Sequence, residues 1–402
     1  MKAEDSNSSK PNILDTIKLS KALRLAKRKS KDGQLEEAKN IYEDILQKFS
    51  KNKEALSELQ LLAGGTTVEP QDPPSEQLQS IINLYTQGQL QQALSESSQM
   101  LERFPNSVVL YNIAGACNAG LMQFDAAIDN YKQALKINPD YQLAMAQKLY
   151  LQAMICDWAA IEEDRDLIQR LGTLTQHIGP FTMLALEDVP ESHRLRSEAH
   201  AKSKYSQKPL PAASKPSQKP KRLRIGYFSA DFHNHATMYL LSKVFELHDK
   251  RNFEVYAYSY GSDKNDHMRQ NLVKSVSVCH DVRKLIDKDV VELARQDKID
   301  IAVDLKGYTK GQRLGLFSYR LAPIQISYLG YPGTLGTEFI DYLIADPIVI
   351  SRDKQHFYSE EVIYLPYTYQ PNDNTREIAK TVTTRSDFCL PEEGFVFCCF
   401  NN

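Results

Sequence analysis

Residues 223–229, LRIGYFS, followed by residues 230–235, ADFHNH, form the stretch that decides the fold. The first part is a short apolar run of strand length, and the second is polar and carries an acid and a histidine four residues apart. A helical pattern follows from about residue 237. A strand, a polar turn and a helix in this order are typical of one unit of an alternating α/β fold.

Strand candidates and helix candidates continue to alternate after this stretch. The strands are expected at 223–229, 253–260, 276–279, 299–305, 324–329 and 342–345. The helices are expected at 237–248, 264–274, 287–297 and 312–320. Strands separated by helices predict right-handed crossovers and a mainly parallel, doubly wound sheet. Ligands of such sheets bind beyond the carboxyl ends of the strands, where the polar turns fall.

A helical repeat precedes the α/β region. GQLQQA at 88–93 is followed 34 residues later by MQFDAA at 122–127. An earlier copy, GQLEEA at 33–38, lies 55 residues before the copy at 88–93, so about 21 extra residues, expected as a loop near 64–74, intervene. A period of 34 with small residues at fixed positions resembles the tetratricopeptide repeat, in which stacked helix pairs bury a shared core. Such an array either offers a concave surface to a partner protein or only props the next domain.

The composition limits the class of protein. Lys and Arg total 49 against 51 Asp and Glu, so the net charge of −2 favours neither nucleic acid nor an anionic membrane as partner. No apolar run is long enough to span a membrane, and no signal-peptide core follows the polar start. The six scattered cysteines lack metal-ligand spacing, which indicates reduced thiols in a cytoplasmic protein. Dinucleotide and phosphate-loop fingerprints are absent, which disfavours oxidoreductases and ATPases.

The turns carry the candidate chemistry. His235 falls where a helix should begin, so the helix dipole would favour a neutral imidazole that can accept a proton. Asp231 either orients His235, binds a hydroxyl or caps the turn. Gly330 and Gly333 would let a backbone approach a ligand closely, and Thr334 adds a hydroxyl, although an ordinary tight turn explains this pattern equally.

Several motifs together resemble the tetratricopeptide-repeat O-linked N-acetylglucosamine transferases and the related Spindly-type protein glycosyltransferases. The resemblance covers about 75–402 and rests on the following segments: CDW at 156–158, RLRIGY at 222–227, SADF at 229–232, NH at 234–235, GYTKG at 307–311, APIQ at 322–325, LGYPGT at 329–334 and FCCFN at 397–401. It implies helical repeats joined to two facing Rossmann-like lobes. It also implies an inverting transfer of N-acetylglucosamine from a UDP-sugar to Ser or Thr of proteins, with no cofactor and no metal.

The resemblance also implies roles for single residues. His235 matches a histidine proposed as general base or acceptor-orienting group, and Asp231 matches its neighbouring acid. The residues that match substrate-binding positions, or that the glycine-rich turn suggests, are Thr237, Lys310, Leu329, Gly330, Gly333 and Thr334. Asn402 is expected beside the nucleotide. The implied partners are a UDP-sugar donor and acceptor proteins bound through the repeats.

Three departures accompany the resemblance. Phe181 stands where the animal enzymes have another active-site histidine, Ala236 replaces a proline, and 304–306 (DLK) replaces an Asn-rich version of that loop. The second lobe is expected to be missing apart from an exposed apolar strand at 395–400, so little or no activity is expected from these 402 residues alone. A Spindly-like O-fucosyltransferase using GDP-fucose and a non-catalytic repeat scaffold remain the alternatives.

The sequence therefore predicts an α plus α/β chain with six segments. They are a disordered segment (1–12), tetratricopeptide-like repeats (13–150), a helical connector with Trp158 as packing anchor (151–201), a Pro/Lys-rich linker (202–221), the N-terminal Rossmann-like lobe of a two-lobed, GT-B-like glycosyltransferase (222–390), and the start of the second lobe (391–402).

Overall fold

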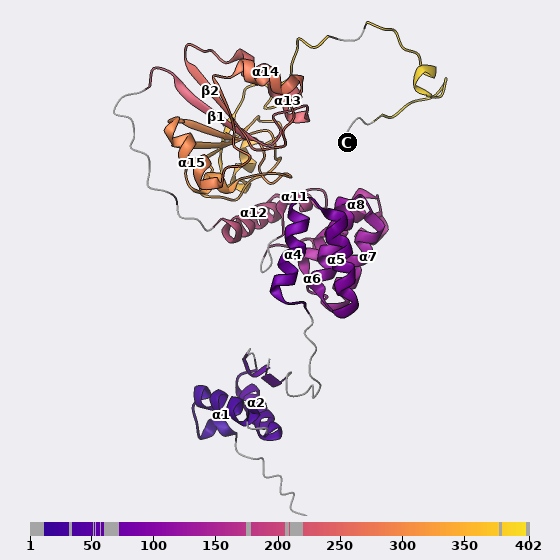
Figure 1. Ribbon diagram of the computed structural model, residues 1–402, viewed down its shortest axis with the longest axis vertical. Coiled ribbons are helices and arrows are strands. Elements are labelled where there is room, and N and C mark those ends of the chain that lie inside the picture. Colours follow the sequence, from indigo (N-terminus) through magenta and orange to yellow (C-terminus); the bar gives the residue numbers. More distant parts are fainter. Residues whose placement is uncertain are drawn as a thin grey trace, which may run out of the picture. The chain divides into compact units, whose positions relative to one another are not determined.

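The computed structural model describes residues 12–31, 34–50, 52, 54–56, 58–59, 72–173, 178–205, 209, 220–377 and 380–398. The chain divides into two compact units, residues 1–117 and 118–402 (Figure 1). The predicted disorder of 1–12 falls outside the described residues except for Asn12. The Asn12 side chain accepts the Leu14 N–H and so caps a short 3-10 helix, η1 (Ile13–Asp15).

The first unit is helical. In its described residues the helices are α1 (Leu19–Lys31), α2 (Leu35–Lys48), α4 (Ser75–Thr86), α5 (Leu90–Arg103) and most of α6 (Val108–Gly120). Most of the loop predicted near 64–74 lies outside the described residues. The second unit continues with α7 (Phe124–Ile137) and α8 (Gln142–Met154).

The predicted repeat spacing is confirmed in the helix bounds. α5 and α7 each have 14 residues and begin 34 residues apart, and α2 also has 14 residues. The fourth residue of each helix is an alanine with no exposed surface: Ala38, Ala93 and Ala127. A methyl side chain at this position lets the neighbouring helix approach closely, which explains why all three copies have a small residue there.

The connector of the second unit is built from α9 (Trp158–Glu163), α10 (Arg165–Ile168), α11 (Pro180–Met183) and α12 (Pro190–Lys204). Trp158 is 61% exposed, so the prediction that it anchors the packing is wrong. The buried anchor is Arg196, whose guanidinium pairs with Glu187 and donates to the Leu171 and Ile168 carbonyls. α12 extends three residues into the stretch predicted as a linker, most of which lies outside the described residues.

A parallel sheet forms the rest of the second unit. Its strands are β1 (Leu223–Ser229), β2 (Phe253–Ser259), β3 (Val278–Asp281), β4 (Ile301–Asp304), β5 (Ile324–Ser327), β6 (Tyr342–Ala345) and β7 (Glu361–Tyr364). The spatial order is β3-β2-β1-β4-β5-β6-β7, and every pairing is parallel. The doubly wound α/β prediction is therefore confirmed. β7 was not predicted, and residues 395–398 form no strand, so that expectation is wrong within the described residues.

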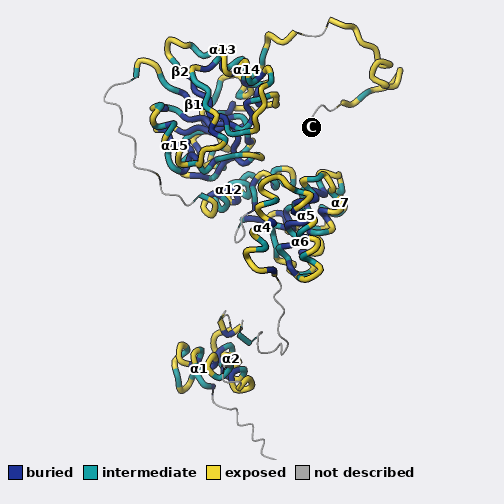
Figure 2. The backbone as a smooth tube through the Cα atoms, in the orientation of Figure 1, coloured by how far each residue is buried: buried dark blue, intermediate teal, exposed yellow. Residues whose placement is uncertain are grey.

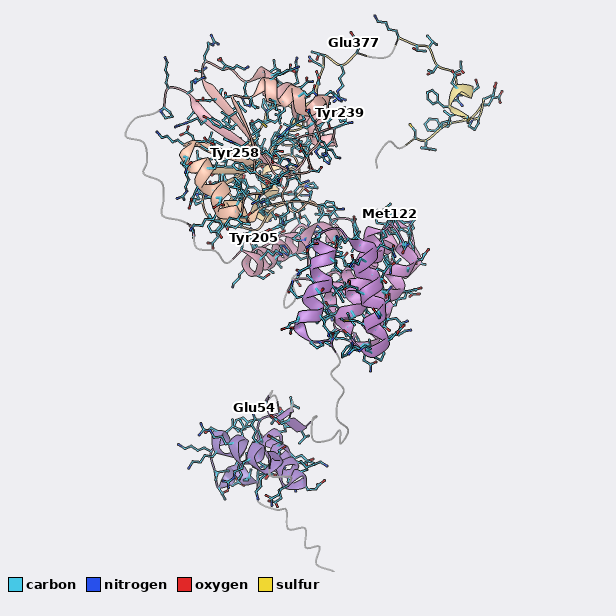
Figure 3. All side chains as sticks on the ribbon, in the orientation of Figure 1. Glu54, Met122, Tyr205, Tyr239, Tyr258 and Glu377 are labelled. Carbon is cyan, nitrogen blue, oxygen red and sulfur yellow. The ribbon has the colours of Figure 1, made fainter. Side chains whose placement is uncertain are left out.

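Helices cover both faces of the sheet, as Figure 1 shows. One core joins the sheet to α13 (Ala236–Leu247) and α14 (His267–Ser275) through residues such as Phe245 and Leu272. The other joins it to α15 (Asp287–Gln296) and α16 (Gly315–Ser318) through residues such as Val291 and Phe317. Tyr258 lies in the second core (Figure 3). The central strands β1, β2, β4 and β5, between these helices, are the buried centre of the lobe (Figure 2).

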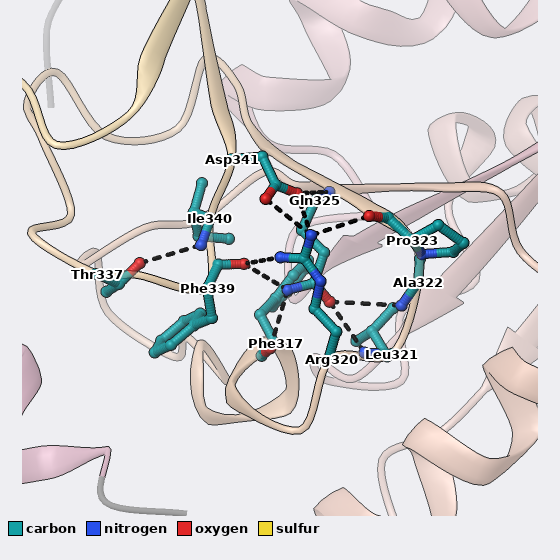
Figure 4. A network of polar contacts seen from close by, with 10 residues as sticks. All are labelled: Phe317, Arg320, Leu321, Ala322, Pro323, Gln325, Thr337, Phe339, Ile340 and Asp341. Atoms are coloured by element: carbon teal, nitrogen blue, oxygen red, sulfur yellow. Dashed lines mark hydrogen bonds and ion pairs between the residues drawn. The ribbon is translucent and has the colours of Figure 1, made fainter. Parts of the chain in front are cut away.

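A polar network fixes the amino ends of β5 and β6 (Figure 4). Arg320 donates to the Phe339 carbonyl at 3.1 Å and to both carboxylate oxygens of Asp341 at 2.8 Å. The fully buried Gln325 donates to the carbonyls of Phe317 at 2.9 Å and Phe339 at 2.6 Å. The network pins the loop that returns from β5 to the start of β6, where no helix makes the crossover.

Candidate functional site

The strand order creates a switch point between β1 and β4. From β1 the chain passes to β2 and β3 on one side, and it then returns to place β4 on the other side of β1. The loops that leave the carboxyl ends of β1 and β4 therefore diverge, and ligands of doubly wound sheets bind in such a crevice. Asp231 and His235 follow β1, Lys310 follows β4, and Leu329 and Gly330 follow the neighbouring β5.

A buried ion pair joins the two loops at the switch point. The ammonium nitrogen of Lys306 donates to Asp231 Oδ2 at 2.6 Å, across 75 residues of sequence. The two side chains are only 6% and 10% exposed. A buried charge is stable only when it is paired, so each residue holds the other in place. Lys306 was noted as a departure from the family but was not predicted as a site residue.

His235 is the N-cap residue of α13. Its Nδ1 accepts the Thr237 N–H at 3.2 Å and lies 3.2 Å from the Thr237 hydroxyl oxygen. Asp231 Oδ2 is 3.7 Å from the same nitrogen, beyond hydrogen-bond distance. The His235 side chain is 42% exposed. Thr237 is buried beneath it, so the hydroxyl of this predicted substrate-binding residue faces His235.

Asp304 fixes the backbone of the loop after β4 by hydrogen bonds. It is 1% exposed, and its two oxygens accept the backbone N–H groups of Lys306 at 3.2 Å and Gly307 at 2.7 Å. Burial raises the pKa of the Asp304 carboxyl to about 6. Gly307 has a φ of +51° and lies against the Tyr331 side chain, which leaves no space for a Cβ. Lys310, at the end of this loop, is exposed.

The loop after β5 touches the loop after β4. A Cβ on Gly330 would lie 1.9 Å from the Leu305 carbonyl oxygen, so only glycine permits this approach. Leu329 holds a left-handed conformation, with a φ of 67°. The close approach that Gly330 permits is thus made to another segment of the protein, and the predicted approach to a ligand stays a prediction.

Thr334 is buried and its hydroxyl is hydrogen-bonded within the protein. It is 4% exposed, and its hydroxyl donates to Glu360 Oε2 at 2.7 Å and lies 3.0 Å from the Ser359 hydroxyl oxygen. Glu360 also accepts the Leu335 N–H at 2.7 Å, and burial raises the pKa of its carboxyl. Thr334 therefore fastens the loop to the residue before β7, and its contact with a substrate stays a prediction.

Among the described residues, the lobe borders at least two cavities. One, of about 340 Å³, lies between the connector residues Leu184–His193 and the loop after β5, and two of the predicted site residues, Gly333 and Thr334, line it. The larger, of about 920 Å³, lies beside α12 and the network of Arg320, and none of the predicted site residues lines it. Phe181 is 41% exposed on α11. Asn402 lies outside the described residues.

The described residues provide two further findings on the class of protein. None of the helices in these parts of the chain is long and apolar enough to cross a membrane. Within the same parts, no three His, Cys, Asp or Glu side chains group as possible ligands of a metal ion.

Residues 202–380 match the family model of glycosyl transferase family 41. The SEC protein of Arabidopsis thaliana, named a probable UDP-N-acetylglucosamine–peptide N-acetylglucosaminyltransferase, is 40% identical over 45% of this chain and 19% of its own length. A SPINDLY protein of Petunia hybrida with the same enzyme name is 32% identical over 45% of this chain and 20% of its own. The chain therefore spans about a fifth of these relatives.

A solved structure extends the similarity into the helices. A mutant of the O-GlcNAc transferase from Thermobaculum terrenum matches with a TM-score of 0.51 and 25% identity. The match covers 88% of this chain and 58% of that protein. The combination of tetratricopeptide-like helices with a parallel sheet is thus a known arrangement.

Proposed function

We propose that this chain, which carries a glycosyl transferase family 41 domain over residues 202–380, is part of a protein O-glycosyltransferase that transfers N-acetylglucosamine from UDP-N-acetylglucosamine to Ser or Thr hydroxyls. The observation that carries the proposal is the meeting of the loops after β1 and β4 at the switch point, where Asp231 and Lys306 form a buried pair and His235, four residues after Asp231, is exposed. The donor is proposed from the names of the relatives.

The proposed reaction is a direct displacement. The acceptor hydroxyl attacks the anomeric carbon, the bond to the diphosphate breaks, and the UDP leaves with that electron pair. An acceptor hydroxyl must be held within about 3–3.5 Å of the carbon that it attacks, and a positioned side chain lowers the barrier further. His235 is proposed to orient this hydroxyl or to accept its proton. The exposed Lys310 and the backbone around Leu329 and Gly330 are proposed to contact the sugar nucleotide.

No cofactor and no metal are proposed, and the acceptor proteins are proposed to bind through the helical repeats. The proposed compartment is the cytoplasm. Five cysteines of the described residues are unpaired, which supports this, because oxidising compartments favour disulfides.

The test is sugar transfer by the protein expressed from its own gene, with every codon downstream of residue 402 that the gene contains. Radiolabelled UDP-N-acetylglucosamine and GDP-fucose are offered separately with a mixture of Ser/Thr peptides. Transfer from the UDP-sugar supports the proposal, whereas transfer from GDP-fucose alone replaces it with the Spindly-like alternative. No transfer from either donor favours a scaffold.

Within the same assay, His235→Ala is expected to lower kcat about 10²-fold, which is the usual scale for loss of a positioned acid–base or orienting group. His267→Ala is the matched control, because His267 is an exposed histidine at the start of another helix, α14, of the same lobe. Unchanged turnover of the His235 variant would remove this residue from the mechanism.

A further inference from the structure

We infer that the neutral imidazole of His235 carries its proton on Nε2, so that this nitrogen presents a hydrogen-bond donor to an oxygen of the ligand, and that Lys306 enforces this tautomer. The inference deepens the proposed function, on which the identity of the ligand rests. The tautomer itself follows from contacts within the protein.

The first observation is the partner of Nδ1. The Thr237 N–H points at this nitrogen at 3.2 Å, and a backbone amide can only donate. A proton on Nδ1 would face the amide hydrogen, and the first-turn amide of α13 would lose its acceptor. The Thr237 hydroxyl at 3.2 Å can donate to the same lone pair. Both neighbours therefore favour an unprotonated Nδ1.

The second observation is the state of Asp231. In a Ser-His-Asp arrangement, the carboxylate accepts the Nδ1 proton and so leaves Nε2 free to act as a base. Here Asp231 Oδ2 accepts from Lys306 at 2.6 Å and stands 3.7 Å from Nδ1. A buried ammonium group at hydrogen-bond distance outcompetes a more distant, half-exposed imidazole for this oxygen. Asp231 is therefore not available to accept a proton from His235 Nδ1.

The other charged groups near the loop do not reverse this preference. The His233 ring lies 5.7 Å from the His235 ring, and burial, followed by the charge of Lys264, lowers the pKa of His233. Asp266 accepts the Asn234 N–H at 2.7 Å and the Arg269 N–H at 3.0 Å, so its carboxylate is engaged with the backbone. Both polar contacts of the His235 ring within the described residues involve Nδ1, which leaves Nε2 for a ligand.

The consequence is a specific role for His235 at the switch point. A neutral imidazole that donates from Nε2 can bind a hydroxyl, carbonyl or phosphate oxygen, but this nitrogen cannot take the proton of the acceptor hydroxyl. In the proposed transfer that proton then leaves with the diphosphate of UDP or passes to solvent. His235 would then orient an oxygen atom of the acceptor or the donor. Lys306 would be a positioning residue, because it acts through Asp231.

The experiment is long-range ¹H–¹⁵N correlation NMR on the full 402-residue chain with ¹⁵N-labelled histidine. The spectra are recorded near pH 8.5, about two units above the ~6.5 of an unperturbed histidine. The signal is assigned by its loss in His235→Gln. We expect the pattern of an Nε2–H ring. An Nδ1–H ring, or rapid exchange with equal populations, would overturn the inference.

Two variants separate Lys306 from Asp231. Asp231→Asn should leave the Nε2–H pattern in place, whereas an arrangement of the Ser-His-Asp type would lose its Nδ1–H pattern. Lys306→Met frees the carboxylate and should raise the Nδ1–H population several-fold; no change would mean that Lys306 does not control the ring. Lys288→Met removes an exposed charge from α15 and is the matched control. Circular dichroism establishes that each variant is folded.

The readout does not depend on catalysis. A chain with the expected tautomer but no sugar transfer from any donor would contradict the proposed function alone. Transfer by a protein in which His235 carries its proton on Nδ1 would contradict the inference alone.

Discussion

Replacing Gly330 by alanine should damage the lobe more than its single methyl group suggests. The added Cβ would lie 1.9 Å from the Leu305 carbonyl oxygen, 2.6 Å from the carbonyl carbon and 3.0 Å from the Lys306 nitrogen. All three atoms belong to the backbone, so no side chain can rotate away. The loops after β4 and β5 would have to separate by more than about 1 Å to restore ordinary contact.

The expected loss of stability depends on how firmly the loop after β4 is held. The backbone after β4 is fastened by the two hydrogen bonds to Asp304 and by the Lys306–Asp231 ion pair. Overpacking of rigid surroundings costs about 1–3 kcal/mol, and sometimes more. Since both partners are backbone, we expect about 3 kcal/mol. For a unit of this size, that corresponds to a fall in Tm of roughly 6–12 °C.

Differential scanning calorimetry measures the Tm, and hydrogen exchange of peptides containing β4 and β5 locates the damage. Gly179→Ala is the matched control: a Cβ there meets open space, and its φ of −60° suits alanine. The control should stay within about 0.5 kcal/mol of the natural chain. A Gly330→Ala protein with the Tm and exchange pattern of the control would refute the argument from close approach.

Three further predictions concern stability. Burial raises the pKa of Asp304 from 3.8 to about 6, so the stabilisation that comes from its protonated carboxyl is fully present below pH 3.8 and is lost as the pH rises through 6. The free energy of unfolding, measured with urea, should therefore fall with pH over this window, and Asp304→Asn should remove this fall. Arg196→Met leaves Glu187 buried without its cation and should cost about 3–5 kcal/mol by thermal unfolding, whereas a mild change would mean that the pair is dispensable. Ala236→Pro should stabilise the chain by about 0.4–1 kcal/mol in the same assay, because residue 236 is the first residue of α13 and His235 before it is extended, with a ψ of 153°. Destabilisation would show that the first turn of α13 does not accept a proline.

Much of the fold could be predicted because it depends on local patterns. Apolar runs of strand length located six strands, and the first matches residue for residue from Leu223 to Ser229. β7 was not predicted because it lies at the sheet edge, where exposed and buried residues alternate from Glu361 to Tyr364, and it therefore lacks a continuous apolar run. Trp158 was misjudged because size and hydrophobicity indicate a core residue on average, whereas its position at the start of α9 leaves it exposed.

The candidate site was predicted only in part. His235, Asp231 and Gly330 fall at strand ends, where sequence order alone indicates a ligand edge. Thr334 was assigned to substrate because its neighbours are glycines, but the tertiary structure brings the buried Glu360 to its hydroxyl. A hydroxyl in a turn carries no local sign of whether a carboxylate 26 residues later will occupy it.

The sequence by itself determined the 34-residue repeat, the alternation of strands and helices, and the polar turns after β1, β4 and β5, because these depend on periodicity and on residue size. Only the tertiary structure decided that Lys306 meets Asp231. That contact requires β4 to lie beside β1 rather than beside β3, which precedes it along the chain. Strand order results from the packing of both faces at once, so a charge pair across the switch point has no signature in either loop alone.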